Sequence, residues 1–354
     1  MTDSRPTGRL GPAQLSEGTE VTGRADTLVS LREGFPAFRI WQEITGDRIR
    51  YVARSRRPGL NPHTIVTADL SELRAALEPS RSAALIPFNP AAPSIARMYD
   101  YMLGGRDNFA ADRSAVRAIL ETFPEAAQIA QANRAFQARA VRHAARQGIT
   151  QYIDLGSGLP TAPNTHETAR QINPGARIAY VDCDELVLAY ARALLSVDDG
   201  VAAIAADIRD PAAVLTGPSL TTLIDLSQPV CLLLVSVLHF LTPAEADAAV
   251  AAYRNRIVPG SYLVISAGTS TGTAPRLIAT FRAAYAQTTR VTGRSEAELA
   301  AWFDGLTLAR PGLTDVQGWR PDSLPRTVGA VSSRARFLAG VARKPAPAST
   351  GWQP

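Results

Sequence analysis

The sequence predicts an α/β protein with a mostly parallel sheet, helices on both faces of that sheet, and a small α+β module at the N-terminal end. From residue 151 onward, short apolar stretches of strand length alternate with stretches of helical periodicity. Residues 230–235 are continuously apolar, which is typical of a central strand that helices cover on both sides. In addition, the sequence D-L-G-S-G at residues 154–158 predicts a buried strand that turns tightly toward a helix.

The composition is that of a globular protein without an evident nucleic-acid partner. The 354 residues, 46% of them hydrophobic, leave room for two domains and a substantial core. The net charge of +5 comes from dispersed arginines, since Lys344 is the only lysine, and no concentrated basic stripe indicates nucleic-acid binding. Cys183 and Cys231 lie in apolar stretches and are expected to be reduced, although a disulfide between them stays open.

Neither a secretory signal nor a membrane span is expected. Residues 1–20 are polar and lack the apolar segment of a signal peptide. The longest apolar run, residues 230–241, contains His239 and is too short to cross a bilayer. We therefore expect a cytoplasmic protein with no membrane partner.

The N-terminal part is expected to form a small module of its own. A short helix is predicted at residues 27–33, two strands at 38–44 and 48–54 with a turn between them, and a helix from Asp69 through Leu77. Nine apolar residues are candidates for its core: Phe35, Phe38, Ile40, Trp41, Ile49, Tyr51, Val52, Ile65 and Val66. The expected organisation of the chain is then a tail at 1–24, this module at 25–79, a Pro- and Ala-rich linker at 80–92, the main domain at 93–344, and a tail at 345–354.

The main domain opens with helices. Ser94 is a candidate N-cap for a helix that Gly104 and Gly105 would end, and two longer helices are predicted at residues 112–122 and 126–146. Two tyrosines, the paired glycines and an Asp-Asn step suit a loop that closes over a ligand. The alternative interpretation of these residues is an ordinary loop whose tyrosines pack in the core.

Strands and helices alternate in the remainder of the chain. Strands are expected at residues 152–155, 177–181, 201–205, 230–235 and 262–266, with further candidates at 306–308 and 335–342. Helices are expected at residues 165–172, 185–195, from 243, at 274–288 and at 296–303. Ligands of such sheets bind beyond the carboxyl ends of the strands, which directs attention to the residues there.

Three carboxylates lie at the ends of three successive predicted strands. Asp154 precedes Gly156 and Gly158, whose turn would bring backbone N–H groups close to a ligand. Asp182 ends the second strand, where it could accept hydrogen bonds from both ribose hydroxyls of a nucleotide-like ligand. Asp207 ends the third strand and could accept from an adenine amine, with Ile208 packing on the ring. Each acid alone could be a cap or a turn residue, but three in register favour a ligand site.

Two ligands suit this pattern. NAD enzymes share the strand, the glycine turn and the acid, but typically carry a third glycine where this sequence has Thr161. S-adenosylmethionine has no phosphate, and its positively charged end favours a nearby carboxylate such as Asp154. The acid before G-S-G therefore favours S-adenosylmethionine.

Six motifs together resemble an S-adenosylmethionine-dependent methyltransferase family that is widespread in actinobacteria and was formerly a domain of unknown function. They are S-I-A-R-M-Y-D-Y-M-L-G-G-R-D-N-F from Ser94, Q-A-N-R-A-F from Gln131, Y-I-D-L-G-S-G-L-P-T from Tyr152, Y-V-D-C-D from Tyr180, A-D-I-R-D from Ala206 and V-S-V-L-H-F from Val235. The resemblance implies a Rossmann-like class I methyltransferase fold, with a sheet of about seven strands that ends in an antiparallel hairpin.

The resemblance also implies roles for the motif residues. The cofactor site would contain Asp154, Gly156, Ser157, Gly158, Asp182, Cys183, Asp207, Ile208 and Ser236. Residues 99–108 would form part of a lid, in which Gly104, Gly105, Asp107 and Asn108 are candidate lid or substrate residues. The module before residue 80 lies outside the family's usual core.

Candidates for catalysis are few. His239 follows the fourth strand and is the first candidate for a base, while His166, after the glycine turn, is the second. Tyr99 and Tyr101 could orient the substrate, and each of these side chains could also be structural. No cluster of metal ligands is evident. No Asn-Pro-Pro-aromatic or Asp-Pro-Pro-aromatic motif follows the fourth strand either, which speaks against the usual amino-methylating nucleic-acid enzymes.

Two functions are consistent with these observations. One is a methyltransferase that acts on an oxygen or nitrogen of a small molecule. The other is a regulatory or accessory protein that binds S-adenosylmethionine without turnover. In either case, the N-terminal module is a candidate surface for a partner or for self-association.

Overall fold

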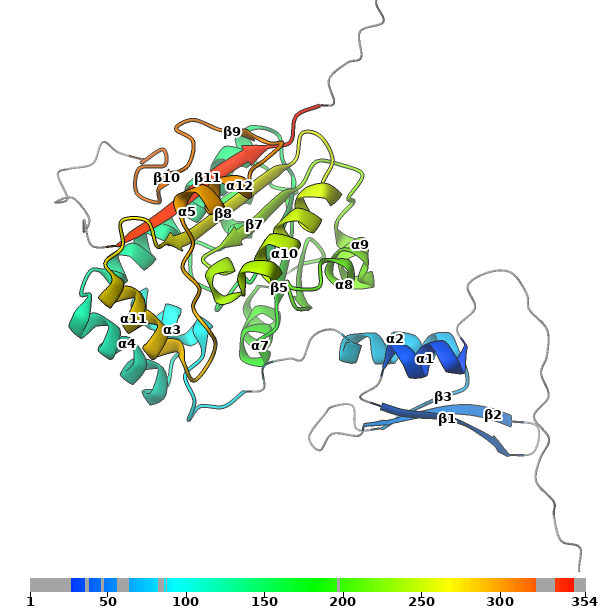
Figure 1. Ribbon diagram of the computed structural model, residues 1–354. Coiled ribbons are helices and arrows are strands. Elements are labelled where there is room, and N and C mark those ends of the chain that lie inside the picture. The colour runs from blue at the N-terminus through cyan, green and yellow to red at the C-terminus, as the bar shows by residue number, and fades with distance from the viewer. Residues whose placement is uncertain are drawn as a thin grey trace, which may run out of the picture. The chain divides into compact units, whose positions relative to one another are not determined.

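The protein is described by a computed structural model that covers residues 27–35, 38–45, 48–55, 64–81, 86, 88–195, 198–322 and 335–346 (Figure 1). It divides into two compact units, Met1–Arg81 and Ser82–Pro354. The expected N-terminal tail, most of the C-terminal tail and the centre of the expected turn at residues 45–47 lie outside the described residues. Among the described residues, no helix combines the length and the hydrophobicity that a membrane span requires.

The first unit is a three-stranded antiparallel sheet with two helices. Its sheet has the order β1-β2-β3, and its elements are α1 (Leu28–Gly34), β1 (Phe38–Thr45), β2 (Arg48–Ser55), β3 (Thr64–Thr67) and α2 (Leu70–Arg81). Thr27 caps α1, and Asp69 Oδ1 accepts hydrogen bonds from the backbone N–H groups of Ser71 and Glu72 at the start of α2. The core of the unit contains Leu31, Phe35, Phe38, Ile40, Ala53, Leu73 and Leu77.

Three sequence-based expectations for this unit were wrong. Strand β3 was not expected, and α2 continues to Arg81 rather than ending at Leu77. Ile49 and Val66 were expected in the core but are 46% and 54% exposed. Side chains alternate along a strand, so Ile65 faces the core and Val66, opposite Val52, faces away from it.

The second unit contains the predicted, mostly parallel sheet, in the order β10-β11-β8-β7-β4-β5-β6 with β9 paired to β11. Strands β4 to β8 pair with one another in parallel, and β11 pairs with β8 antiparallel. The sheet of about seven strands with an antiparallel end is thus confirmed. The bounds are β4 (Gln151–Leu155), β5 (Arg177–Asp182), β6 (Val201–Ala205), β7 (Cys231–Val235), β8 (Tyr262–Thr269), β9 (Thr307–Leu308), β10 (Thr314–Asp315) and β11 (Arg336–Arg343).

Helices cover both faces of this sheet because its strands alternate between two apolar clusters. Tyr152 of β4 packs in one cluster with Phe136 and Val141 of α5, whereas its neighbour Ile153 packs in the other with Val250 of α10. The helices are α3 (Ile95–Met102), α4 (Ala110–Thr122), α5 (Ala126–Arg146), α6 (Thr165–Arg170), α7 (Glu185–Leu194), α8 (Pro211–Thr216), α9 (Pro218–Leu223), η1 (Leu238–Phe240), α10 (Pro243–Arg256), α11 (Pro275–Tyr285) and α12 (Glu296–Ala301).

A third apolar cluster lies beyond the carboxyl ends of the parallel strands. Helices α3, α4 and α11 pack together there (Figure 1), with Met98, Ile119 and Leu277 among the buried residues that join them. The helix α3 begins after Ser94 as expected. The Ser94 hydroxyl does not cap it, however, but donates to Asp184 Oδ2 at 2.9 Å. This cluster therefore faces the edge of the sheet where ligands of α/β proteins bind.

Candidate functional site

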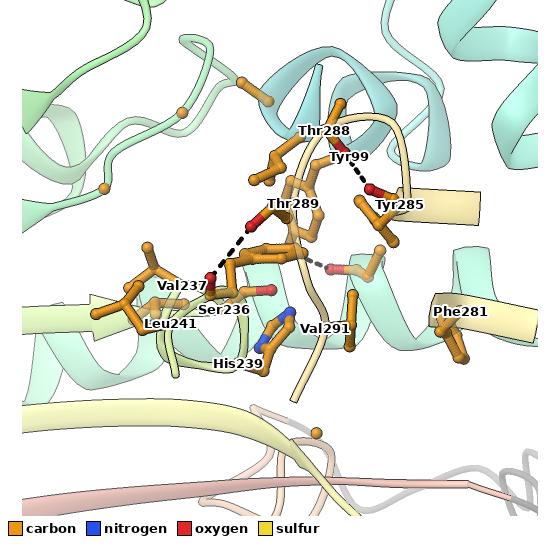
Figure 2. A pocket seen from close by; sticks show the side chains of 18 of the residues that line it. Tyr99, Ser236, Val237, His239, Leu241, Phe281, Tyr285, Thr288, Thr289 and Val291 are labelled. Atoms are coloured by element: carbon orange, nitrogen blue, oxygen red, sulfur yellow. Dashed lines mark hydrogen bonds between the residues drawn. The ribbon is translucent and has the colours of Figure 1, made fainter. Parts of the chain in front are cut away.

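A cavity of about 720 Å³ opens at the carboxyl ends of the parallel strands. The carboxyl end of each of these strands lies at the cavity wall. The lining there includes Asp154 of β4, Asp182 of β5, Ala206 after β6, Ser236 after β7 and Thr269 of β8. The third apolar cluster closes the cavity on another side, and Figure 2 shows several of the side chains that line it there. The cavity thus has an acidic part at the strand ends and an apolar part under α3 and α11.

The glycine turn has the geometry that its sequence predicts. Gly156 and Gly158 have φ values of 72° and 66°, in the left-handed region that favours glycine. The backbone N–H of Gly156 donates to the carbonyl of Val181 at 2.8 Å, which ties the turn to β5. A Cβ atom at Gly156 would lie 2.6 Å from Val237 Cγ2, whereas one at Gly158 would have no neighbour within 4 Å.

Asp154 is held at the base of this turn. It is 3% exposed, and its Oδ2 accepts hydrogen bonds from Thr165 Oγ1 at 2.7 Å and Gln137 Nε2 at 2.9 Å. Burial raises the pKa of Asp154 to about 6, because the charged carboxylate is poorly solvated there. Arg134 donates hydrogen bonds to Gln137 Oε1 at 2.8 Å and to the carbonyls of Thr161 and Pro163. It therefore fixes the positions of Gln137, which binds Asp154, and of the loop after the glycine turn.

Asp182 links β5 to the same turn. Its Oδ2 accepts from the Gly158 N–H at 2.9 Å, and its Oδ1 accepts from the N–H groups of Cys183 and Asp184 at 2.8 and 3.0 Å. Burial outweighs these hydrogen bonds and raises the pKa of Asp182 to about 6. The carboxylate is therefore fixed in direction by three backbone donors while it still lines the cavity.

Asp207, Ile208 and Cys183 line the cavity beside Asp182. The Asp207 carboxylate binds the Arg209 side chain, whose Nε lies 2.9 Å from Oδ2, and it also accepts from the Arg209 N–H at 2.8 Å. A ligand amine at Asp207 would have to share this carboxylate with Arg209. The two cysteines are free, with Cys183 half-buried and Cys231 buried in β7.

A buried polar network joins β7, β8, α5 and α3 at the centre of the cavity wall. The Ser236 N–H donates to Ser266 Oγ at 3.1 Å, and Ser266 Oγ donates to Asn133 Oδ1 at 2.6 Å. Asn133 Nδ2 then donates to the Tyr99 hydroxyl at 2.9 Å, and that hydroxyl donates to the carbonyl of Ala130 at 3.0 Å. The network holds Tyr99 against the wall and stabilises Ser236, whose φ is 60°.

Sequence reasoning missed the inner members of these networks. Asn133 and Arg134 were not among the expected site residues, yet both line the cavity and Asn133 is 1% exposed. Gln137, Thr165 and Ser266 were not singled out. Their spacing in the sequence could have indicated that they are buried. Asn133 and Gln137 are four residues apart, on the face of α5 that also carries the apolar residues.

His239 lies in η1, which follows β7, and it lines the cavity (Figure 2). Its ring packs against Phe240 and Phe337, with centroids at 4.2 and 5.7 Å. Its Nδ1 is buried and has no hydrogen-bond partner among the described residues. Burial lowers the pKa of His239 to about 4, so the imidazole is neutral at physiological pH.

Six expected site residues do not line the cavity: Tyr101, Gly104, Gly105, Asp107, Asn108 and His166. Asp107 and Asn108 fold the loop instead, because the Asp107 N–H and Asn108 Nδ2 both donate to Asp100 Oδ2, at 3.0 and 2.8 Å. His166 is buried with its Nδ1 2.9 Å from the Tyr180 hydroxyl. The wall that residues 99–108 were expected to form comes largely from residues 92–97, with Tyr99 and Met102.

The donor set suits a cation-bearing nucleoside better than a metal. Among the residues that the structure describes, no group of three or more His, Cys, Asp or Glu side chains is arranged to hold a metal ion. Carboxylates at the ends of β4, β5 and β6 can instead accept from ribose and adenine groups and can balance a positive charge.

Comparison with known proteins agrees with this chemistry. A model of the S-adenosyl methyltransferase family matches residues 83–345. The chain belongs to this family. It is a methyltransferase with a class I fold, and its cofactor is S-adenosylmethionine. Nothing in the comparisons supports the alternative of an accessory protein without turnover.

Two solved structures are similar over nearly their whole length. A protein of Thermobifida fusca YX, provisionally named a methyltransferase, is 39% identical with a TM-score of 0.68, and the match covers 72% of this chain and 96% of that one. A DUF574-family protein of Streptomyces avermitilis MA-4680 is 35% identical with a TM-score of 0.68, and the match covers 72% of this chain and 98% of that one. A comparison with curated proteins gave no match.

Proposed function

We propose that this methyltransferase methylates an oxygen or nitrogen of a small molecule that occupies the apolar part of the cavity. The observation that carries this proposal is the position of His239, a neutral imidazole that lines the cavity, comes three residues after Ser236 and packs against Phe240 and Phe337. A neutral ring nitrogen there can accept a hydrogen bond, and then a proton, from an O–H or N–H group of the substrate.

The acidic part holds the cofactor in this proposal. Asp182 accepts from the ribose hydroxyls, Asp207 and Ile208 face the adenine, and Asp154 lies toward the positively charged end. The remaining cofactor contacts are assigned to Gly156, Ser157, Gly158, Cys183 and Ser236, all of which line the cavity. When bound, S-adenosylmethionine supplies a methyl group on an electrophilic sulfur, so the protein's own task is to position the acceptor and receive its proton.

The test measures methyl transfer from labelled S-adenosylmethionine to compounds in a cell extract. It compares wild type with His239→Asn. The control is His143→Gln, since His143 does not line the cavity. We expect His239→Asn to lower the transfer rate about 10²–10⁴-fold, the usual contribution of general base catalysis. Cofactor affinity should not change, and His143→Gln should behave as wild type. An undiminished rate in His239→Asn would overturn the role of His239.

We also propose a cytoplasmic location. The support is that both cysteines are free, with Cys231 buried inside the sheet.

A further inference from the structure

The apolar part of the cavity is walled by five aromatic rings from four separate segments. The rings are those of Phe123, Phe240, Phe281, Tyr285 and Phe337. Phe123 and Phe281 meet edge to face with centroids 6.1 Å apart, and Phe240 and Tyr285 meet at 5.1 Å. Walls of this kind bind flat apolar groups by stacking and edge contacts.

Among the residues that the structure describes, no charged side chain without a partner lines this part of the cavity. Four arginines line the cavity as a whole, and each is engaged by other groups of the protein: Arg97 with Asp112, Arg134 with backbone carbonyls and Gln137, Arg209 with Asp207, and Arg336 with Glu296 and Asp315. The acids that line the cavity lie at or just after the carboxyl ends of β4, β5 and β6, in the part assigned to the cofactor. An ionised phosphate or carboxylate on the substrate would therefore lose water without gaining a partner among the described residues.

One hydroxyl on this wall is available to a ligand. Tyr285 is 4% exposed and lines the cavity, and its hydroxyl makes no hydrogen bond with any described residue. The neighbouring Tyr99 hydroxyl is already used twice, since it donates to Ala130 and accepts from Asn133. Burial raises the pKa of Tyr285, so its hydroxyl keeps its proton and acts as a donor.

We propose that the methyl acceptor is an uncharged aromatic compound whose ring packs between Phe240, Phe281 and Phe337, and that Tyr285 determines specificity by donating a hydrogen bond to an oxygen or nitrogen of that compound. This inference rests on the proposed function of the cavity. It adds the class of substrate and the residue that selects it, because a buried hydroxyl left unpaired disfavours a ligand without an acceptor.

The test uses three probes that share a naphthalene ring and differ in the substituent on it: 1-naphthol, naphthalene and 1-naphthyl phosphate. Each is titrated by fluorescence into the full-length protein saturated with S-adenosylhomocysteine. Wild type is expected to bind 1-naphthol at least about tenfold more tightly than the phosphate, because the phosphate has no cation to pair with. Tyr285→Phe should weaken 1-naphthol binding about two- to tenfold, as expected for one lost hydrogen bond, and should not weaken the binding of naphthalene, which has no acceptor.

Tyr190→Phe is the matched control, since Tyr190 lies outside the cavity lining and binds Asp107. Equal or tighter binding of the phosphate, or identical 1-naphthol affinity in wild type and Tyr285→Phe, would overturn the inference. Binding is read without turnover. Absence of methyl transfer in the extract assay would therefore count against the proposed function, whereas the probe titrations alone decide the substrate class.

Discussion

Asp154 and Asp182 give the site a pH dependence of predictable sign. Burial raises the pKa of each to about 6, above the ordinary value of 3.8. A positively charged cofactor binds the ionised forms better, so its affinity should fall as the pH is lowered from 7.5 to 5. Calorimetric titration of S-adenosylmethionine across this range measures the effect, and Asp154→Asn should flatten part of it. A constant affinity would contradict the assignment.

The same two acids affect stability in the opposite sense. Because their folded pKa values are raised, the unfolded chain releases these protons at lower pH than the folded chain. Their contribution to the free energy of unfolding therefore decreases as the pH rises from about 4 to about 6. Denaturant titrations of wild type and Asp154→Asn without cofactor should show this loss in wild type and a smaller one in the variant. No difference between the two slopes would count against the raised pKa of Asp154.

The side chain of Asn133 is expected to contribute to the free energy of unfolding. Its side chain is the middle of the network from Ser236 to Tyr99, so Asn133→Ala leaves buried hydroxyls with fewer partners. We expect a loss of about 1–3 kcal/mol in the free energy of unfolding. Gln131→Ala, at an exposed position of the same helix, is the control and should change little. Equal effects of the two substitutions would show that the network contributes nothing.

At the scale of elements, the glycine turn offers a matched pair of substitutions. Both glycines have positive φ, so alanine at either position is strained by about 1–3 kcal/mol. Only at Gly156 would the new Cβ also meet Val237, at 2.6 Å. Gly156→Ala should therefore reduce both stability and cofactor affinity more than Gly158→Ala. Thermal denaturation and calorimetry compare them, and the reverse order would contradict the geometry of the turn.

The accuracy of sequence reasoning depended on the length and regularity of each element. Strands β4 to β8 were predicted to within a few residues, because continuous apolar stretches of strand length between turn residues allow few alternatives. The short elements β3, β10, α8 and α9 were missed, since two to six residues carry too little periodicity and depend on tertiary contacts.

The segment after Ser94 shows why the role of polar residues is difficult to predict from sequence. Its Asp, Asn and paired glycines resemble a ligand loop, yet Asp100 uses Asp107 and Asn108 to fold the loop itself. A Cβ at Gly105 would lie 2.0 Å from Asp100 Oδ1, so glycine at this position allows the Asp100 carboxylate to pack against the backbone. Whether polar groups face a ligand or one another is decided by distances that sequence patterns do not contain.

At the scale of the whole molecule, the acidic part of the site was predictable and the apolar part was not. Parallel strands bring their carboxyl ends to one edge, so Asp154, Asp182 and Asp207 were expected to meet there. The aromatic wall joins Phe123, Phe240, Phe281 and Phe337, which are scattered over four segments and share no local pattern. Only the packing of α3, α4 and α11 over the strand ends brings them together.

The second unit should bind the cofactor alone. Every described residue that lines the cavity belongs to this unit, and the family match begins at residue 83. A chain that starts at Ser82 is therefore expected to bind S-adenosylhomocysteine with the affinity of the full chain in a calorimetric titration. A clearly weaker affinity would assign the first unit a part in cofactor binding. The role of that unit as a surface for a partner or for self-association stays a prediction.

The most direct test of the cofactor site is calorimetry with S-adenosylhomocysteine on wild type, Asp182→Ala and the exposed-acid control Asp304→Ala. Asp182 is fixed by three backbone donors at the end of β5, and its loss should leave bound hydroxyls unpaired. We predict an affinity lower by about 1–3 kcal/mol for Asp182→Ala and no change for Asp304→Ala. Unchanged affinity in Asp182→Ala, or tighter binding of NAD than of S-adenosylhomocysteine by wild type, would contradict the account.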